Sequence, residues 1–126
     1  MNAQLKTVLV VDDEDINFIL IVEMLEEFGY NFIKAENGLK AFELCKDNQN
    51  INLVLMDIKM PIMDGYISAK KIKEIRPNLP IIAQTAHALV GDRELALSNG
   101  CDEYISKPID RIRLIKLVNT FLHITE

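Results

Sequence analysis

Cysteine is scarce in this chain, and neither of its two cysteines belongs to a metal-binding pattern. Cys45 and Cys101 stand far apart, without the close spacing that zinc ligands show. We therefore expect each of them to pack as a small apolar side chain in a reducing, cytoplasmic environment and not to form a disulfide.

Long apolar runs and an excess of positive charge are missing as well. No stretch approaches the roughly 20 apolar residues that span a bilayer, and the opening MNAQLK lacks the apolar segment of a signal peptide. Lys and Arg number 14 against 19 Asp and Glu, and the net charge of -5 speaks against a nucleic-acid-binding face. We expect a cytoplasmic protein with no membrane and no nucleic-acid partner.

The rest of the composition is that of one compact domain. The chain has 126 residues, of which 49% are hydrophobic and 26% charged. It contains no linker, no low-complexity stretch and no remnant of a second domain. We expect a single domain over residues 1–126 with its core at about 7–122, and no output domain.

Short apolar runs alternate with segments of helical periodicity along the whole chain. The expected strands are Thr7–Val11, Asn31–Ala35, Asn52–Met56, Pro80–Ala83 and Glu103–Ile105. The expected helices are Ile16–Phe28, Leu39–Asp47, Tyr66–Ile75, Leu89–Ser98 and Ile112–Leu122. Five such repeats predict an α/β fold with a doubly wound five-stranded parallel sheet in the order 2-1-3-4-5 and five helices.

Polar side chains stand where these strands end. Asp12 and Asp13 follow the first expected strand, and Asp57, Thr85 and Lys107 follow the third, fourth and fifth. Parallel strands present their carboxyl ends at one edge of the sheet, and the switch point of the 2-1-3-4-5 order lies between the first and third strands. Three carboxylates brought together there repel one another, which favours a divalent cation or a phosphoryl group as their ligand.

Each of these residues also has a simpler explanation when it is taken alone. Asp12 and Asp13 fit a cap of the following helix, and Asp57 fits a turn before a proline. Thr85 suits a turn, and Lys107 suits a solvated surface. All of these explanations would have to place their residue at the same edge of one sheet, so we favour a common site.

The motifs around these positions resemble the receiver domain of two-component response regulators. The matching segments are VDDED, LMDIKMPIMDGY, QTAHA and SKP, and the match runs from about Thr7 to Leu122. The later half, TAHALVGDRELALSNGCDEYISKP, is especially similar to receiver domains of hybrid sensor histidine kinases. The resemblance implies a flavodoxin-like receiver fold and a phosphorelay signalling function. It also implies that the chain catalyses only its own aspartyl phosphorylation and dephosphorylation.

The resemblance implies a chemical role for each of these positions. Asp57 is expected to accept a phosphoryl group from a phosphohistidine or a small phosphodonor; its carboxylate is already ionised, so it needs no base. Asp13 and Asp57 are expected to ligate Mg²⁺ together with the backbone carbonyl of Lys59, and Asp12 through a bridging water.

Further positions are implied to bind the phosphoryl group and to transmit its presence. Lys107 and the Thr85 hydroxyl are expected to contact phosphoryl oxygens, with backbone amides of Ile58 and Ala86 as additional donors. On phosphorylation Thr85 moves toward the new charge and Tyr104 turns inward. The surface that switches is expected to comprise Ala88–Ser98, Glu103–Ile105 and Ile112–Leu122. Lys107-Pro108 resembles the cis peptide of the family.

The expected partner is a sensor histidine kinase or a phosphotransfer protein. Asn17, Phe18 and Ile21 on the first helix suggest a docking patch for a pair of kinase helices, with core packing as the alternative for Phe18. A phosphorylation-dependent homodimer is also consistent with the resemblance. The initiating Met1 favours a stand-alone regulator, whereas the later half of the sequence favours a piece of a hybrid kinase.

Three residues depart from the commonest pattern of the family. Lys59 and His87 are not suited to orienting a hydrolytic water, so we expect a moderately long-lived phosphoryl group. Gln84 replaces a residue that is usually small or aliphatic, and the sequence offers no physical account of it.

Other classes of protein remain as alternatives. A haloacid-dehalogenase-like phosphatase also uses an aspartate after a strand with Mg²⁺, but it expects Thr or Val where Asn17 stands and normally carries a cap insertion. A flavodoxin-like carrier needs a phosphate-binding loop where this chain has acids. An inactive pseudo-receiver would lack Asp13, Asp57 or Lys107, and all three are present.

Overall fold

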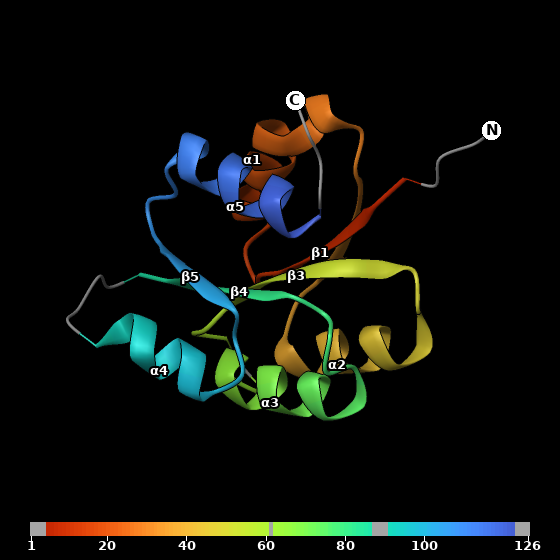
Figure 1. Cartoon of the computed structure of the whole chain (residues 1–126), viewed down its shortest axis with the longest axis vertical. Coiled ribbons are helices and arrows are strands. Elements are labelled where there is room, and N and C mark those ends of the chain that lie inside the picture. Colours follow the sequence, from red (N-terminus) through yellow and green to blue (C-terminus); the bar gives the residue numbers. More distant parts are fainter. Residues whose placement is uncertain (1–4, 61, 87–90, 123–126) are drawn as a thin grey trace.

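A five-stranded parallel sheet forms the centre of the protein (Figure 1). The computed structural model describes residues 5–60, 62–86 and 91–122. The strands are β1 (Thr7–Val11), β2 (Asn31–Ala35), β3 (Ile51–Asp57), β4 (Ile81–Thr85) and β5 (Glu103–Ser106). They lie in the order β2-β1-β3-β4-β5, and every neighbouring pair is parallel. The predicted fold class is confirmed.

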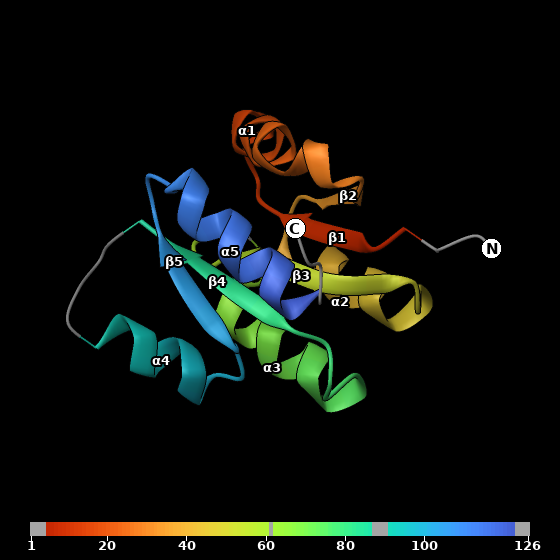
Figure 2. The ribbon, with the colours of Figure 1, turned by 45° about the horizontal axis from the view of Figure 1, so that its top comes forward.

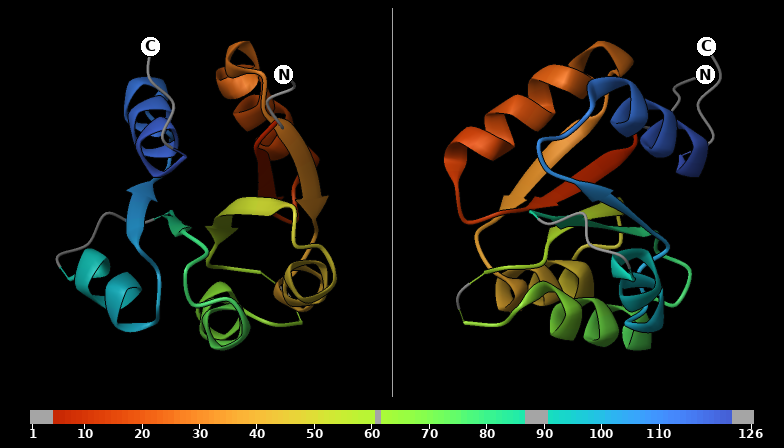
Figure 3. Two further views of the ribbon diagram at one scale, coloured as in Figure 1. Left: turned by 45° about the vertical axis from the view of Figure 1, so that its right-hand side comes forward. Right: turned by 90° about the vertical axis from the view of Figure 1, so that its left-hand side faces the viewer.

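Helices cover both faces of this sheet. They are α1 (Asp15–Leu25), α2 (Gly38–Asp47), α3 (Gly65–Ile75), α4 (Asp92–Ser98) and α5 (Arg111–Phe121), and a 3₁₀ turn (Glu26–Phe28) extends α1. Figures 1, 2 and 3 show α1 and α5 on one face and α2, α3 and α4 on the other. No helix within the described ranges is long and apolar enough to cross a membrane.

Short polar side chains fix where several helices begin. Asn37 accepts a hydrogen bond from the Lys40 amide at the start of α2, and Asp64 accepts one from Ile67 at the start of α3. Asp110 caps α5 in the same way, by accepting a hydrogen bond from the Ile112 amide. Such caps satisfy backbone donors that have no partner inside the helix.

The core consists of two apolar layers, one on each face of the sheet. Leu9 and Met56 belong to the layer under α2, α3 and α4, whereas Val10 and Leu55 belong to the layer under α1 and α5. Successive side chains of a strand point to opposite faces, so β1 and β3 are mostly apolar and completely buried over most of their length. The acidic residues at the ends of these two strands are therefore held by the best-packed part of the sheet.

Several apolar residues of α1 lie at the surface of the protein, and the residues expected on its docking patch are buried or half-buried. Ile16, Ile19 and Leu20 are 59%, 53% and 44% exposed. Ile21, expected on an exposed docking patch, is only 1% exposed, and Phe18 is half-buried against the core. The helix is apolar around nearly its whole circumference, so its sequence alone does not define the buried side.

The inward side of α3 also differs from the prediction. The spacing of Ile67, Ile72 and Ile75 in the sequence predicts that all three face the core, but Ile67 and Ile75 are 49% and 42% exposed and only Ile72 is buried. Ser68 is buried as well, and its hydroxyl donates a 2.7 Å hydrogen bond to the carbonyl of Gly38 in α2. Small residues therefore line the contact between α2 and α3, and they displace the larger ones to the surface.

The helical pattern of α3 predicts that Lys73 lies on its outer side, but its side chain is partly buried. Its ammonium lies 2.7 Å from Asp102, whose carboxylate in turn accepts a hydrogen bond from the amide of Ile81. This ion pair joins α3 to the segments that enter β4 and β5.

Several element boundaries shift by a few residues. The strand expected at Pro80–Ala83 runs from Ile81 to Thr85, so that Gln84 and Thr85 belong to β4. Helix α4 begins at Asp92 after Gly91, whose φ of 94° is unfavourable for other residues. The earlier start expected at Leu89 lies outside the described residues.

Both cysteines are buried and free, as the sequence predicted. Burial raises the pKa of Cys45 to about 11 and that of Cys101 to about 12. Their thiols therefore stay protonated at neutral pH and behave as small apolar side chains.

Candidate functional site

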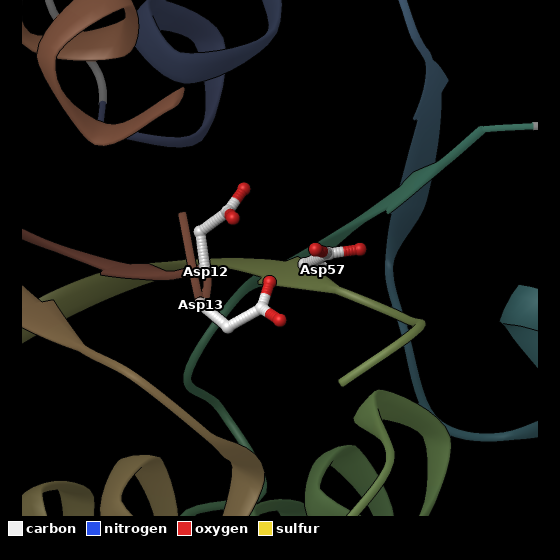
Figure 4. A group of neighbouring side chains, drawn as sticks. All are labelled: Asp12, Asp13 and Asp57. Atoms are coloured by element: carbon white, nitrogen blue, oxygen red, sulfur yellow. The ribbon is translucent and has the colours of Figure 1, made fainter. Parts of the chain in front are cut away.

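Three carboxylates come together at the carboxyl edge of the sheet (Figure 4). The register pairs Val11 with Met56, which sets Asp12 and Asp57 side by side at the ends of β1 and β3. One oxygen from each of Asp12, Asp13 and Asp57 lies within 4.8 Å of the others. Figure 4 shows that Asp13 extends toward Asp57, whereas the Asp12 carboxylate turns to the other side of the strand. The predicted cluster of acids is present.

Asp12 is completely buried and anchors the turn that leads into α1. Its Oδ1 accepts a 2.9 Å hydrogen bond from the amide of Glu14, and the Asn17 side chain lies 3.5 Å away. The residue that caps α1 is Glu14, whose side chain makes no capping hydrogen bond. The alternative that Asp12 and Asp13 serve as helix caps is therefore wrong, and the exposed Asp13 is left facing the cluster.

Lys107 extends from the end of β5 across to the acids. Its Nζ lies 3.4 Å from Asp57 Oδ2 and 3.5 Å from Asp12 Oδ2, and its side chain is 23% exposed. The Lys107 amide donates a 2.7 Å hydrogen bond to the carbonyl of Thr85, and Lys107-Pro108 is a cis peptide as expected. A solvated surface lysine would not make these contacts, so that simpler explanation fails.

The electrostatics of Asp57 follow from this packing. The residue is 6% exposed, and burial raises the pKa of its carboxyl group; the Lys107 ammonium lowers that pKa and the Asp12 carboxylate raises it. Among the described residues, Lys107 pairs with Asp57 and Asp12, and Asp13 adds a third carboxylate to the cluster. A divalent cation bound between them would reduce the remaining repulsion, and the carboxylate-rich donor set suits Mg²⁺.

A hollow of about 560 Å³ opens beside the acids. It is lined by Asp13, Ile58, Lys59, Met60, Asp64 and Tyr66. Gly65 lies next to these lining residues in the chain, and its amide donates a hydrogen bond to the Ile58 carbonyl. A Cβ at this position would lie 2.4 Å from the carbonyl oxygen of Asp57. The hollow lies beside the residues that directly follow Asp57 and beside Asp13 of the acid cluster.

The backbone amides after Asp57 are used differently from the prediction. The amide of Ile58, expected to contact a phosphoryl group, donates a 3.1 Å hydrogen bond to the carbonyl of Gln84. That expectation does not fit this geometry, because the parallel ladder between β3 and β4 continues one residue beyond the strand. The amide of Lys59, which the sequence reading missed as a donor, lies 3.3 Å from Asp57 Oδ1.

The remaining predicted residues lie on β4 and β5. Thr85 is half-buried at the end of β4, next to Lys107, and the following Ala86 is exposed. Tyr104 is a half-buried residue of β5 that packs against the core layer under α2, α3 and α4. His87 lies outside the described residues.

Gln84 is the residue of the site that the sequence did not explain. The register places it directly beside Asp57, and it is completely buried. A glutamine within the otherwise apolar run of the fourth strand was the signal available in the sequence.

The protein is a doubly wound α/β domain with an acidic pocket and a lysine at the switch point of its sheet. Comparison with known proteins identifies the family to which it belongs. A model of the response regulator receiver domain matches residues 8–119. The chain belongs to this family of two-component signalling domains.

Curated and solved relatives agree with this assignment. The polar-differentiation response regulator DivK of Brucella anthropi is 38% identical over 120 residues, which cover 93% of this chain and 96% of that protein. The receiver domain of the sensor histidine kinase PA1611 from Pseudomonas aeruginosa is 33% identical with a TM-score of 0.84, covering 95% of this chain and 99% of that one. It was solved with a magnesium ion coordinated in its active-site cleft.

A third match comes from a complex. A chain in the co-crystal structure of the Saccharomyces cerevisiae phosphotransfer protein Ypd1 with the receiver domain of Ssk1 is 26% identical, with a TM-score of 0.85. The match covers 96% of this chain and 91% of that chain. Relatives thus include a protein named as a response regulator and a domain of a histidine kinase.

Proposed function

We propose that this chain accepts a phosphoryl group on Asp57 with the help of Mg²⁺. The single observation that carries the proposal is the position of Asp57, which lies within one cluster with Asp13 and 3.4 Å from the Lys107 ammonium. A carboxylate oxygen of Asp57 attacks phosphorus, and the bond from phosphorus to the donor's nitrogen or oxygen breaks.

The proposed metal ligands are Asp13, Asp57 and the backbone carbonyl of Lys59, with Asp12 contributing through water. Bound there, Mg²⁺ would neutralise charge on the phosphoryl oxygens. The side chain of Lys107 and the hydroxyl of Thr85 would bind the phosphoryl oxygens.

The proposed backbone donors to the phosphoryl group are the amides of Lys59 and Ala86. Lys59 replaces Ile58 in this role, since the Ile58 amide is already hydrogen-bonded to β4.

Incubation with acetyl phosphate and Mg²⁺, followed by intact-mass measurement, tests this function. We expect a gain of one phosphoryl group that Asp57→Asn abolishes and that the exposed-acid control Glu36→Gln retains. No gain in the folded wild-type protein would contradict the proposal. Steady turnover of a phosphomonoester would favour the phosphatase alternative instead.

The partner surface that we propose differs from the sequence prediction. Ile16, Ile19 and Leu20 form an exposed apolar stripe on α1. A hollow of about 250 Å³ between α1 and the loop before α5 continues this stripe toward Lys107. We propose that a phosphotransfer protein or histidine kinase docks here; the Ypd1–Ssk1 complex supports this kind of partner for a receiver domain.

Phosphotransfer from a candidate histidine kinase tests the docking surface. Leu20→Ala should slow transfer from the kinase without changing the rate with acetyl phosphate, whereas the exposed Leu39→Ala on α2 should change neither. Equal slowing with both donors would show that Leu20 serves the site itself and not the partner.

The proposed switch is the surface of α4, β5 and α5, with Tyr104 and Thr85 as its moving residues. Two observations support this surface: Tyr104 is half-buried, and the Lys107 amide donates a hydrogen bond to the Thr85 carbonyl.

We also propose that the phosphoryl group on Asp57 survives longer than seconds. A time course of phosphoprotein decay would check this.

A further inference from the structure

Gln84 is a buried amide in the same row of side chains as the acids. The register pairs it with Asp57 on one side and with Ile105 on the other. Side chains at the same level of a parallel sheet share a face, and neighbouring strands are about 4.8 Å apart. Gln84 and Asp57 therefore project side by side toward the layer of α1 and α5, which also contains Ile82 and Ile105.

Within the part of the chain that the structure describes, neither polar atom of this side chain has a hydrogen-bond partner. Gln84 is 0% exposed, and no residue of the described ranges donates to its Oε1 or accepts from its Nε2. A buried amide without partners is unfavourable, and an aliphatic residue would fill the same place without that penalty. Asp12 Oδ2 is likewise buried and lacks a hydrogen bond among these residues. The unsatisfied groups thus belong to one end of the sheet.

The lysine of the site has to cross the strand that carries Gln84. Lys107 follows β5, whereas its ammonium lies beside Asp57 on β3, and β4 is between these two strands. Its Nζ is 3.4 and 3.5 Å from two carboxylate oxygens, longer than the 2.7–2.9 Å or so of strong charge-assisted hydrogen bonds. An ammonium has three N–H donors, so Lys107 has capacity for a closer acceptor.

We propose that Gln84 is a positioning residue for phosphorylation of Asp57, an inference that rests on the proposed function. In the loaded site its Oε1 accepts a hydrogen bond from Lys107 Nζ, and its Nε2 donates to the neighbouring Asp57 carboxyl oxygen. The terminal torsion of a glutamine side chain is soft, so the amide can turn its two polar atoms toward these neighbours when the site is loaded. The amide then holds the lysine over Asp57, where it can meet the incoming phosphoryl oxygens.

Gln84→Met tests the proposal because methionine keeps the length of the side chain but removes its hydrogen bonds. At saturating Mg²⁺ we expect phosphorylation by acetyl phosphate to slow about tenfold, the size expected for a lost hydrogen bond to a charged group. The Mg²⁺ dissociation constant should stay within twofold, and the melting temperature without Mg²⁺ should not fall. Gln84→Leu should behave alike, and Ile82→Leu, on the same strand and face, should phosphorylate at the wild-type rate.

A Lys107→Ala background separates positioning from a structural role. If Gln84 acts mainly through the lysine, Gln84→Met should cause a smaller loss there than in the wild-type background, because only its hydrogen bond to Asp57 remains to be lost; the loss is measured as the affinity for beryllofluoride or as the residual rate. An equal loss in both backgrounds overturns the proposal, as do wild-type rates in both Gln84 variants or a lower melting temperature in both. Failure of the wild-type protein to take up a phosphoryl group would instead refute the proposed function.

Discussion

The ammonium of Lys107 lies 3.4 Å from Oδ2 of Asp57, although the two residues come from strands that are not neighbours in the sheet. β4, which lies between these strands, ends at Thr85, one residue beyond the partner of Asp57, and the Lys107 amide is hydrogen-bonded to the Thr85 carbonyl. The contact places the positive charge beside the residue that we expect to be phosphorylated.

Mg²⁺ should stabilise the folded protein, because the proposed binding site at the acid cluster exists in the native state and not in the unfolded chain. At a hundred times its dissociation constant the gain is about 2.7 kcal/mol. Asp13→Asn should remove most of this gain, as measured by the melting temperature with and without Mg²⁺. Asp47→Asn, an exposed acid at the end of α2, should leave the gain unchanged. Equal gains in the two variants would refute Asp13 as a ligand.

Without Mg²⁺, Asp57→Asn should stabilise the protein at neutral pH. Burial raises the pKa of the Asp57 carboxyl group above its unfolded value, so the ionised form is less favourable in the folded state. This penalty develops as the pH rises from about 4, the unfolded pKa, through the raised native pKa. Urea unfolding in a chelator should therefore show a gain at pH 7.5 that disappears below about pH 4.

The matched control for this measurement is Glu36→Gln, which removes an exposed acid. It should show little change at either pH. A destabilised Asp57→Asn at pH 7.5 would mean that the ion pair with Lys107 outweighs burial and the repulsion from Asp12.

Ile62 has a backbone conformation that suits few residues. Its φ is 73°, and its side chain is 78% exposed. The left-handed region is unfavourable for L-residues by about 1–2 kcal/mol and less so for Asn. Ile62→Asn should therefore raise the free energy of unfolding by about 1 kcal/mol in urea titrations. Ile112→Asn, at a helical position that is 77% exposed, should give no gain.

Gly65→Ala should disturb both stability and the site. The added Cβ would lie 2.4 Å from the Asp57 carbonyl oxygen and 2.8 Å from Ile58 Cα, so the backbone that carries Asp57 must shift. We expect a loss of about 2 kcal/mol in stability and a slower phosphorylation by acetyl phosphate. Gly38→Ala provides the control, since its Cβ would meet the Met63 carbonyl oxygen at the same 2.4 Å. It should destabilise the protein but slow phosphorylation less.

The strand ends of the site were predictable from the sequence. β1 and β3 are continuous apolar runs that stop at Asp12 and Asp57, and Lys107 follows the last strand. The start of α5 was equally clear, because Asp110 is a good capping residue. These features depend on local patterns of a few residues.

The buried sides of α1 and α3 were not predictable in the same way. Nearly every residue of α1 is apolar, and only packing against α5 and the sheet buries Ile21 while leaving Ile19 exposed. In α3 the close contact with α2 selects Ser68 over Ile67 as the inward residue. Burial here depends on segments that are distant along the chain.

The sequence by itself determined the order of the elements and the positions of the acids at strand ends, because alternating periodicity and short apolar runs specify a parallel α/β sheet. Only the tertiary structure decided that the amide of Ile58 is used by β4 and that Gln84 is buried beside Asp57. Both depend on the register between β3 and β4, which is set by packing between segments far apart in the sequence and leaves no local pattern in it.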